Sequence, residues 1–440
     1  MKIKKLLKNS AIFFSPFILI LFILFCINIF IKDLNFGHKA FNVKGNSMDW
    51  FTYYYYLNKK KINNYLISFI KKDEKGLPKV EINISEKSLN KLLSDVPSST
   101  KKYVGAEFKK DNLIQKVQMR YFGDNPINWM FHQKAIRLKT KKKELINGKR
   151  YFEYKPSQRN IISDYTAYKF AKKLGILVSD VRLVELFINN NSSGIYIERE
   201  NLNESFLRRN KIMPVNLYKG EASRNSEKKI GLVENLDENP GLWEKVSFLN
   251  TVKTSDYKDL ENFINNQREA DISNEKLKNL LNFGNAELFA KIAILESLLN
   301  QEINDYTHNR RLLIDVWSGK KHIIPHDFYY NKKEINEDSF NLDICSTRLF
   351  CILNQSSEFL DIKYSLLYKI VIEEKIFDEV IKDLEEIKSQ FLVTQKTDLG
   401  SIFRKYVLAR QYEGPENKES FENILNSLKI RKNKLIKILE

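Results

Sequence analysis

Two aspartates flank a short segment that has the pattern of a β-hairpin. The stretch NDYTHNRRLLIDVWSGKKHIIPHDF, residues 304–328, holds two strand-like runs around a Ser-Gly turn, with Asp305 before the first run and Asp327 after the second. Because an antiparallel return brings the two ends of a hairpin together, both carboxylates are expected at one end. Paired carboxylates suit phosphoryl transfer, in which one orients the attacking hydroxyl and the other holds a divalent cation on the phosphates. Asn309 could add a neutral oxygen ligand to that cation.

The same aspartates also have a purely structural interpretation, in which the first caps the hairpin and the second caps a turn. A zinc site made of His308, His322 and His326 is a further alternative. The four-residue spacing of the last two would place them on one face of a helix, but Pro325 between them favours a strand and a loop. Zinc is therefore not expected. The chain also contains no glycine-rich phosphate loop and no Gly-x-Ser-x-Gly motif.

The N-terminal segment has the composition of a membrane anchor. Four lysines within the first eight residues precede an uncharged run from Ala11 to Ile31, which as a helix spans about 31 Å. No small-x-small cleavage site follows, so residues 1–35 are predicted to be an uncleaved single-pass helix; a cleaved signal peptide is the alternative. The lysines predict a cytoplasmic N-terminus and an extracytoplasmic main domain. Residues 36–78 are expected to form a juxtamembrane helical stalk.

The rest of the chain is strongly basic. The formal net charge is +18, and +14 remains without the four N-terminal lysines. Such an excess suits an anionic surface polymer, lipid head groups or a phosphorylated ligand, whereas no nucleic-acid-binding motif occurs. The densest run, Lys139 to Arg150, is interpreted as a solvated loop. Cys345 and Cys351 could form a disulfide in an extracytoplasmic domain or remain two buried thiols.

Hydrophobic periodicity divides the chain into a β-rich first half and a helical second half. Ser85 and Ser163 are each predicted to cap a helix, and Gly175 is predicted to end the second one. The second half contains a long apolar helix around residues 286–300 and amphipathic helices from about residue 356 to the end. This α+β pattern favours a ligand held between two lobes. The strand-like runs are KVEINIS, YVGAEFK, LIQKVQMRYFG, KAIRLKT, VRLVELFIN and GIYIERE.

Four segments occur in the order seen in one known family. They are VQMRYFGDNPINWMFHQKAIRLKT, LFINNNSSGIYIERENLNESFL, NLYKGE and the hairpin segment described first. Over roughly Lys79 to Asn331 the chain resembles the CotH family, which is a highly diverged protein-kinase family. The resemblance implies an α+β, kinase-like fold with two lobes, β-rich over about 79–225 and helical over about 226–440, behind an N-terminal transmembrane helix.

The resemblance also implies roles for individual residues, with ATP and Mg²⁺ or Mn²⁺ as cofactors. Asp305 would orient the acceptor hydroxyl, and Asp327 would bind the metal with help from Asn309. The residues implied for the nucleotide are Glu200, Lys219, and Lys134 or Arg120 beside the phosphates. For Glu200 and Lys134 a plain surface position at a strand is the equal alternative.

The chain departs from the family pattern at one place. Where the family shows Trp-Asp-x-Asp, this sequence has His326, Asp327, Phe328 and Tyr329, so the second acid is missing and metal affinity should fall. Two hypotheses follow. One is a membrane-anchored phosphotransferase that moves the ATP γ-phosphoryl group to a hydroxyl in a protein or a surface glycan. The other is a catalytically inactive relative that binds an anionic cell-surface polymer or a partner protein.

Overall fold

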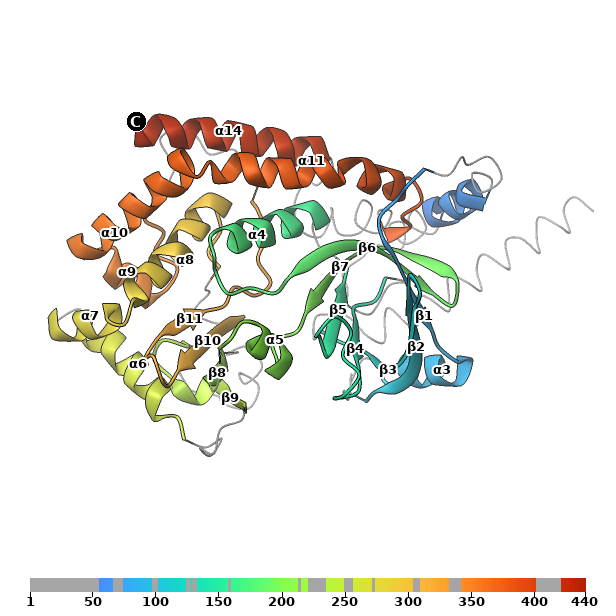
Figure 1. Cartoon of the computed structure of the whole chain (residues 1–440), viewed down its shortest axis with the longest axis horizontal. Coiled ribbons are helices and arrows are strands. Elements are labelled where there is room, and N and C mark those ends of the chain that lie inside the picture. The colour runs from blue at the N-terminus through green and yellow to red at the C-terminus, as the bar shows by residue number, and fades with distance from the viewer. Residues whose placement is uncertain are drawn as a thin grey trace, which may run out of the picture.

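The protein has an α+β fold in which a β-barrel, a second sheet and a set of helices pack together (Figure 1). The computed structural model describes residues 55–65, 74–96, 102–123, 128, 133–156, 160–212, 215–220, 235–248, 256–270, 274–303, 309–331, 342–400 and 421–440. The α+β expectation is therefore confirmed.

Seven of the described strands close into a barrel in the order β1-β2-β3-β4-β5-β7-β6. Neighbouring strands pair antiparallel except β1 and β6, which pair in parallel and close the barrel. Alternate side chains such as Phe108, Leu138 and Tyr196 fill its interior. The predicted strand runs are confirmed, but closure of the sheet was not predicted. The strands are β1 Lys79–Asn83, β2 Val104–Lys110, β3 Leu113–Tyr121, β4 Ile136–Lys139, β5 Tyr151–Lys155, β6 Val181–Ile188 and β7 Asn191–Glu200.

Two helices accompany the barrel, and one has a different cap from the predicted one. Ser85 caps α3 (Glu86–Ser94) as expected, accepting a hydrogen bond from the Ser88 amide at 3.2 Å. In α4 (Ile161–Lys173), however, the cap is Asn160, whose side chain accepts from the Ile162 amide at 2.9 Å.

The prediction that Ser163 caps α4 is wrong because the buried residues before it already belong to the helix. The Ser163 hydroxyl instead donates to the carbonyl oxygen of Tyr330. The predicted end of α4 is confirmed, since Gly175 adopts a left-handed φ of 67°.

A second sheet has the order β11-β10-β8-β9. The predicted hairpin is confirmed in β10 and β11, which pair antiparallel through Leu312 and Ile323 and turn at Gly319 with a φ of 70°. On its other side β10 pairs with β8, so the NLYKG segment lies beside the hairpin. The elements are α5 Glu204–Arg209, β8 Val215–Gly220, η3 Pro240–Leu242, β9 Trp243–Phe248, β10 Arg310–Asp315 and β11 Lys321–Ile323.

The helices of the second half pack around α8 (Asn285–Leu299). The predicted helix is confirmed, but it is buried on nearly all sides rather than along one stripe. Its side chains belong to a core that also includes Ile195 and Ile197 of the barrel strand β7, so barrel and helices share one apolar interior. The remaining helices are α6 Lys258–Glu269, α7 Asn274–Leu281, α9 Arg348–Leu353, α10 Ser357–Tyr368, the π-helical turn η5 Lys369–Glu373, α11 Ile376–Gln395 and α14 Phe421–Leu439.

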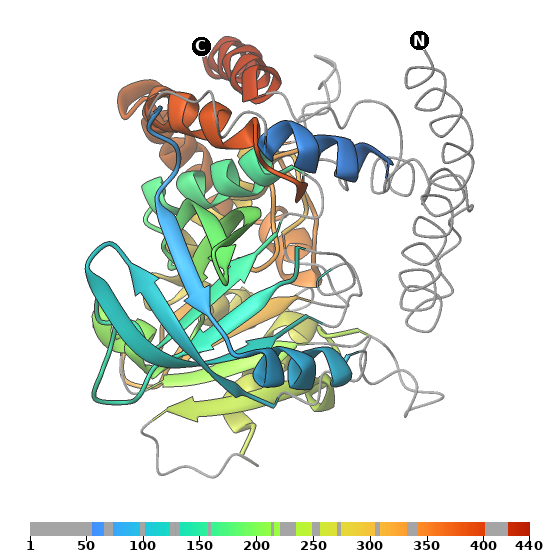
Figure 2. The same cartoon turned by 90° about the vertical axis from the view of Figure 1, so that its right-hand side faces the viewer.

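Part of the predicted stalk is a helix that docks on the domain. Residues 55–65 are helical and lie beside the end of α11 (Figure 2). Lys60 Nζ donates to the Asp398 carbonyl oxygen at 2.5 Å, and Asn64 Nδ2 donates to that of Thr397 at 2.8 Å. The predicted anchor, residues 1–35, lies outside the described residues. Among the helices that the structure does describe, none has the length and apolar character needed to cross a bilayer.

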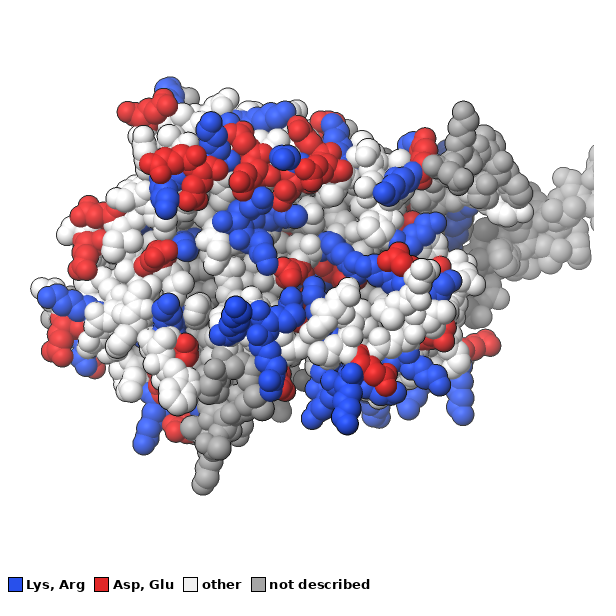
Figure 3. Space-filling view, in the orientation of Figure 1, with Lys and Arg blue, Asp and Glu red and all other residues white. Residues whose placement is uncertain are grey.

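Charge is distributed unevenly over the surface. In Figure 3 acidic side chains gather over the upper part, where α11 and α14 lie, while Lys and Arg gather along the lower edge near the barrel. Acids of α11 pair with lysines of the neighbouring helices α4 and α14, as in Lys169–Asp383 at 3.3 Å and Lys432–Asp378 at 2.6 Å. The basic run at 139–150 begins with the last residue of β4, Lys139, and continues as the predicted loop over residues 140–150, with one bridge between Ile146 and Lys149. Of the two alternatives for Cys345 and Cys351, the structure has the disulfide, with the Cα atoms 4.6 Å apart.

Candidate functional site

A row of charged side chains crosses four adjacent barrel strands. Arg120 on β3 pairs with Arg137 on β4, Arg137 with Glu153 on β5, and Glu153 with Arg199 on β7. On β3, β4 and β5 the residues next to them in sequence fill the barrel, so the row lies on the outer face because side chains alternate along a strand.

Glu153 is the shared carboxylate of this row. Its side chain is 2% exposed, and it accepts hydrogen bonds from Arg137 Nε at 2.9 Å, Arg199 Nε at 2.7 Å and Asn201 Nδ2 at 2.6 Å. Burial by itself raises the pKa of Glu153, but Arg137 and Arg199 outweigh that effect and hold the pKa well below its usual range. Glu153 is therefore ionised at neutral pH and fixes two guanidinium groups.

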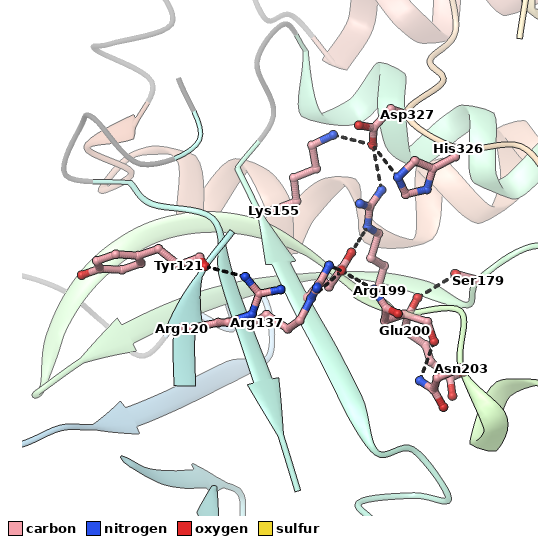
Figure 4. Close-up of polar contacts among 12 residues, drawn as sticks. Arg120, Tyr121, Arg137, Lys155, Ser179, Arg199, Glu200, Asn203, His326 and Asp327 are labelled. Carbon is pink, nitrogen blue, oxygen red and sulfur yellow. Dashed lines mark hydrogen bonds and ion pairs between the residues drawn. The ribbon is translucent and has the colours of Figure 1, made fainter. Parts of the chain in front are cut away.

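Arg199 connects the row to Asp327 (Figure 4). Arg199 Nη1 lies 3.0 Å from Asp327 Oδ1, and Lys155 Nζ contacts the same oxygen at 2.6 Å. Asp327 follows the hairpin with a left-handed φ of 57°, a conformation that aspartate tolerates better than most residues. Burial favours a raised pKa for Asp327, but Lys155 and Arg199 outweigh it and bring the pKa well below its ordinary value. The carboxylate is thus ionised and already paired with two cations.

His326 lies next to this ion pair without adding charge to it. Its Nε2 is 3.9 Å from Asp327 Oδ1. Burial lowers the pKa of His326 well below the usual value, and the cations Arg311 and Arg199 act in the same direction. The imidazole is therefore neutral at neutral pH.

The second sheet contributes two further cations. Lys219 on β8 is paired with Arg311 on β10 on one side and with Glu244 on β9 on the other. Burial lowers the pKa of Lys219; Glu244 opposes this, whereas Arg311 and Arg137 lower the pKa further. Arg311 lies beside the segment that leads to Asp327, because its carbonyl oxygen accepts a hydrogen bond from the Ile324 amide at 2.9 Å.

The site has an excess of positive charge. Its six cations are Arg120, Arg137, Lys155, Arg199, Lys219 and Arg311, against the three carboxylates Glu153, Glu244 and Asp327. Like charges directly opposite on adjacent strands are destabilising, as for Arg120 beside Arg137. The Arg120 side chain is buried, and its Nε has no hydrogen-bond partner among the described residues. This arrangement favours the binding of an anion such as a phosphate group.

The structure brings together some of the predicted residues and separates others. Asp327, Lys219 and Arg120 belong to the cationic site. Lys134 lies just before β4, where its Nζ is 5.9 Å from the centre of the Tyr121 ring. Asp305 lies outside the described residues, so its distance from Asp327 stays a prediction.

Glu200 and Asn309 have different surroundings. Glu200 is on the opposite face of β7 from Arg199, buried, and its carboxylate accepts from Arg209 and from Ser205 Oγ. Burial raises its pKa, although Arg209 opposes the shift. Asn309 directly precedes β10 with a φ of 59°, and the hairpin register places it at the same end as Asp327.

Sequence reasoning missed Arg137, Glu153, Lys155 and Arg199. A signal for Arg137 was present, because Arg137 alternates with the apolar residues Ile136 and Leu138 in the strand-like run KAIRLKT. No local pattern indicated that a glutamate 16 residues later would be its partner, since this depends on the register between β4 and β5.

The donor set around Asp327 is sparse for a divalent cation. The described residues contain no group of three or more His, Cys, Asp or Glu side chains that could hold a metal ion. Carboxylate oxygens suit Mg²⁺ and Mn²⁺, which commonly bind one or two carboxylates, water and the phosphates of a nucleotide. Asp327 fits that chemistry as a single ligand, but Lys155 and Arg199 occupy its Oδ1. The zinc set remains unsupported, and His308 lies outside the described residues.

Comparison with known proteins gives a family match. The family model described as "CotH kinase protein" matches residues 120–414. No curated protein matches the chain. Among solved structures, the chain is similar to the proinflammatory kinase CtkA of Helicobacter pylori at 11% identity, covering 73% of this chain and 92% of that one with a TM-score of 0.24. It is also similar to the HipA–HipB toxin–antitoxin complex of Shewanella oneidensis with operator DNA, at 12% identity, 93% and 82% coverage and a TM-score of 0.30.

Proposed function

Since this chain belongs to the CotH kinase family, we propose that it is a phosphotransferase that moves the γ-phosphoryl group of ATP to a hydroxyl group. The observation that carries the proposal is the cationic site, in which Lys155 and Arg199 contact Asp327 and Glu153 joins Arg199 to Arg137. Phosphoryl transfer depends mainly on positioning and on neutralising the charge of the phosphates. The proposal includes the kinase-like arrangement of a β-rich lobe over about 79–225 and a helical lobe over about 226–440.

In this proposal the cations of the two sheets bind the triphosphate from two sides. Arg137 and Arg120 reach it from the barrel, and Lys219 and Arg311 reach it from the second sheet. Arg137 is held in place by the Glu153 carboxylate, so its planar guanidinium is oriented before the nucleotide arrives.

The two aspartates have different roles in this proposal. Asp305 orients the acceptor hydroxyl and accepts its proton. Asp327 would hold a divalent cation, with Asn309 as a candidate neutral ligand, and a bound Mg²⁺ or Mn²⁺ would offset negative charge on the phosphates.

The proposed setting is the outer face of a membrane. The support comes from the apolar run at Ala11–Ile31, from the lysines that precede it, and from the disulfide between Cys345 and Cys351, which is typical of oxidising compartments. The acceptor would then be a hydroxyl in a protein or in a surface glycan.

A second candidate function is an inactive binder of an anionic surface polymer or a partner protein. The specific observation in its favour is the pairing of Asp327 with two cations, together with Tyr329 in place of the second acid. Both candidates use the cationic site, but only the enzyme needs Asp305.

Nucleotide binding is the first test. The purified full chain in detergent should show a rising thermal midpoint when ATP is titrated with Mg²⁺ or Mn²⁺, because a ligand that binds the folded state stabilises it. Arg137→Gln should weaken ATP binding about tenfold or more, since it removes a charged hydrogen-bond donor. Arg208→Gln is the matched control, as Arg208 pairs with Glu204 on the surface of α5. No stabilisation by millimolar ATP with either metal would rule out the proposal.

Phosphoryl transfer is the second test. Asp305→Asn should preserve ATP binding and abolish transfer of labelled phosphate to an acceptor. If Asp305→Asn transfers phosphate at the wild-type rate, the chemistry depends on other residues. If the wild-type chain binds ATP but transfers nothing to protein or glycan acceptors, the binder is favoured.

A further inference from the structure

The two cations on Asp327 are held very differently. Arg199 is 5% exposed and has three partners, with Nε on Glu153 at 2.7 Å and Nη1 shared between Tyr168 Oη at 3.1 Å and Asp327 Oδ1 at 3.0 Å. Removing Arg199 from Asp327 would therefore disturb a buried network. Arg199 is a permanent neighbour of this carboxylate.

Lys155 has a much looser attachment. It is near the end of β5, its side chain is 16% exposed, and the described part of the chain offers its ammonium group only the Asp327 carboxylate as an ion-pair partner. That carboxylate is itself 32% exposed. A lysine carries its charge on a flexible stem, so the ammonium can leave Asp327 without moving the strand.

The contact that Lys155 makes is also the one that a metal ion would need. Its Nζ lies 2.6 Å from Asp327 Oδ1. A divalent cation at this oxygen would be repelled by both groups that contact it, the Lys155 ammonium and the Arg199 guanidinium. Of the two, Lys155 is the one with no other ion-pair partner among the described residues. The missing second acid at Tyr329 leaves no nearby carboxylate in this motif to compensate.

We propose that Lys155 is a built-in counterion that takes the place of a divalent cation at Asp327, so that the free protein has low affinity for metal. A metal ion at Asp327 Oδ1 would have to displace Lys155, the cation with fewer partners on that oxygen, whereas Arg199 stays bound to the Glu153 carboxylate. The displaced ammonium then lies beside the site proposed for the phosphates. This inference deepens the proposed function, on which it rests for the identity of Asp327 as a metal ligand.

Its test is a metal titration without nucleotide, so it can succeed or fail independently of ATP binding. Mn²⁺ binding to the full chain would be measured by electron paramagnetic resonance and calorimetry. Lys155→Met, which retains the length of the side chain and removes its charge, should raise the affinity for Mn²⁺ about tenfold. The matched control is Lys109→Met, because Lys109 pairs with Glu81 at 3.1 Å on the barrel strands β1 and β2, and this variant should bind Mn²⁺ as the wild type does.

A double variant locates the gain. Adding Asp327→Asn to Lys155→Met should remove the extra affinity, because the carboxylate is then absent. The proposal is overturned if Lys155→Met binds Mn²⁺ no better than Lys109→Met, including the case in which neither binds, or if the gain survives in the double variant. Lys155→Gln serves as a second neutral variant, and thermal unfolding of each protein shows that it is folded.

Discussion

At the scale of single residues, the site depends on Glu153. This buried carboxylate neutralises Arg137 and Arg199, and Arg199 in turn contacts Asp327. A single side chain therefore fixes both a proposed phosphate ligand and a neighbour of the proposed metal ligand. Its substitution should affect folding and binding together.

We expect Glu153→Gln to lower the free energy of unfolding by about 3 kcal/mol, because it leaves buried guanidinium charge without its carboxylate. Urea unfolding at pH 7 measures this change. Glu144→Gln is the control, since Glu144 pairs with Lys141 on the surface with both side chains largely exposed, and it should change stability by less than about 1 kcal/mol. Equal effects of the two substitutions would contradict the role given to Glu153.

The same comparison has a defined pH dependence. Because the pKa of Glu153 is lower in the folded chain than in the unfolded one, its stabilising effect is complete above the unfolded pKa of about 4.3 and is lost as the pH falls toward the folded pKa. The difference in stability between wild type and Glu153→Gln should therefore be constant near neutral pH and narrow below about pH 4. A difference that widens on acidification would show that the carboxylate is not held ionised.

At the scale of elements, the start of α4 shows how local signals compete. Asn160 accepts hydrogen bonds from the amides of Ile162 and Ser163, whereas the hydroxyl of Ser163 bonds to the Tyr330 carbonyl. Asn160→Ala should cost about 1 kcal/mol, as is usual for the loss of a helix cap. In contrast, Asn265→Ala on the exposed surface of α6 should leave stability unchanged or raise it slightly, because alanine favours a helix. Urea unfolding of both variants measures the change in the free energy of unfolding, which should fall for Asn160→Ala and stay the same or rise for Asn265→Ala.

Much of the secondary structure could be predicted from local patterns. Alternating residues predicted most barrel strands and placed Arg137 on the other face of β4 from Ile136 and Leu138, and the Ser-Gly turn predicted the β10–β11 hairpin. The cap of α4 was missed because both Asn160 and Ser163 are suitable cap residues and only burial of the intervening isoleucines decides between them.

The candidate site was predictable only in part. Asp327 and Lys219 were predicted because each lies within a short sequence motif, the hairpin segment for Asp327 and NLYKGE for Lys219. The Arg137–Glu153–Arg199 row depends on the register of three strands, and the contact between Lys155 and Asp327 joins residues 172 apart. Such long-range pairings leave no local pattern in a single sequence.

At the scale of the whole molecule, Asp398 joins distant parts of the chain. It is 1% exposed, and its Oδ1 accepts from the Ile195 amide of β7 at 3.3 Å, the Gly400 amide at 3.0 Å and Gln133 Nε2 at 3.4 Å. Gly194 adopts a φ of 103°, and a side chain there would collide with Asp398 and Gln133. The barrel thus contacts the segment after α11 through a close backbone approach.

Asp398→Ala should lower the free energy of unfolding by about 2 kcal/mol, because it leaves buried donors without an acceptor. Asp361→Ala, on the exposed side of α10, is the control and should change stability by no more than about 0.5 kcal/mol. Chemical unfolding monitored by circular dichroism measures both. If Asp398→Ala lowers the free energy of unfolding no more than Asp361→Ala does, the contact between Asp398 and β7 does not stabilise the fold.

The parallel pairing of β1 with β6 has a consequence for biosynthesis. Val80 of β1 pairs with Leu186 of β6, so the ribosome must synthesise more than a hundred further residues before β1 can pair with β6. Until then the nascent sheet has an open edge that can recruit strands from other chains. We therefore expect chaperone dependence to be greatest while the polypeptide between these two strands is being translated.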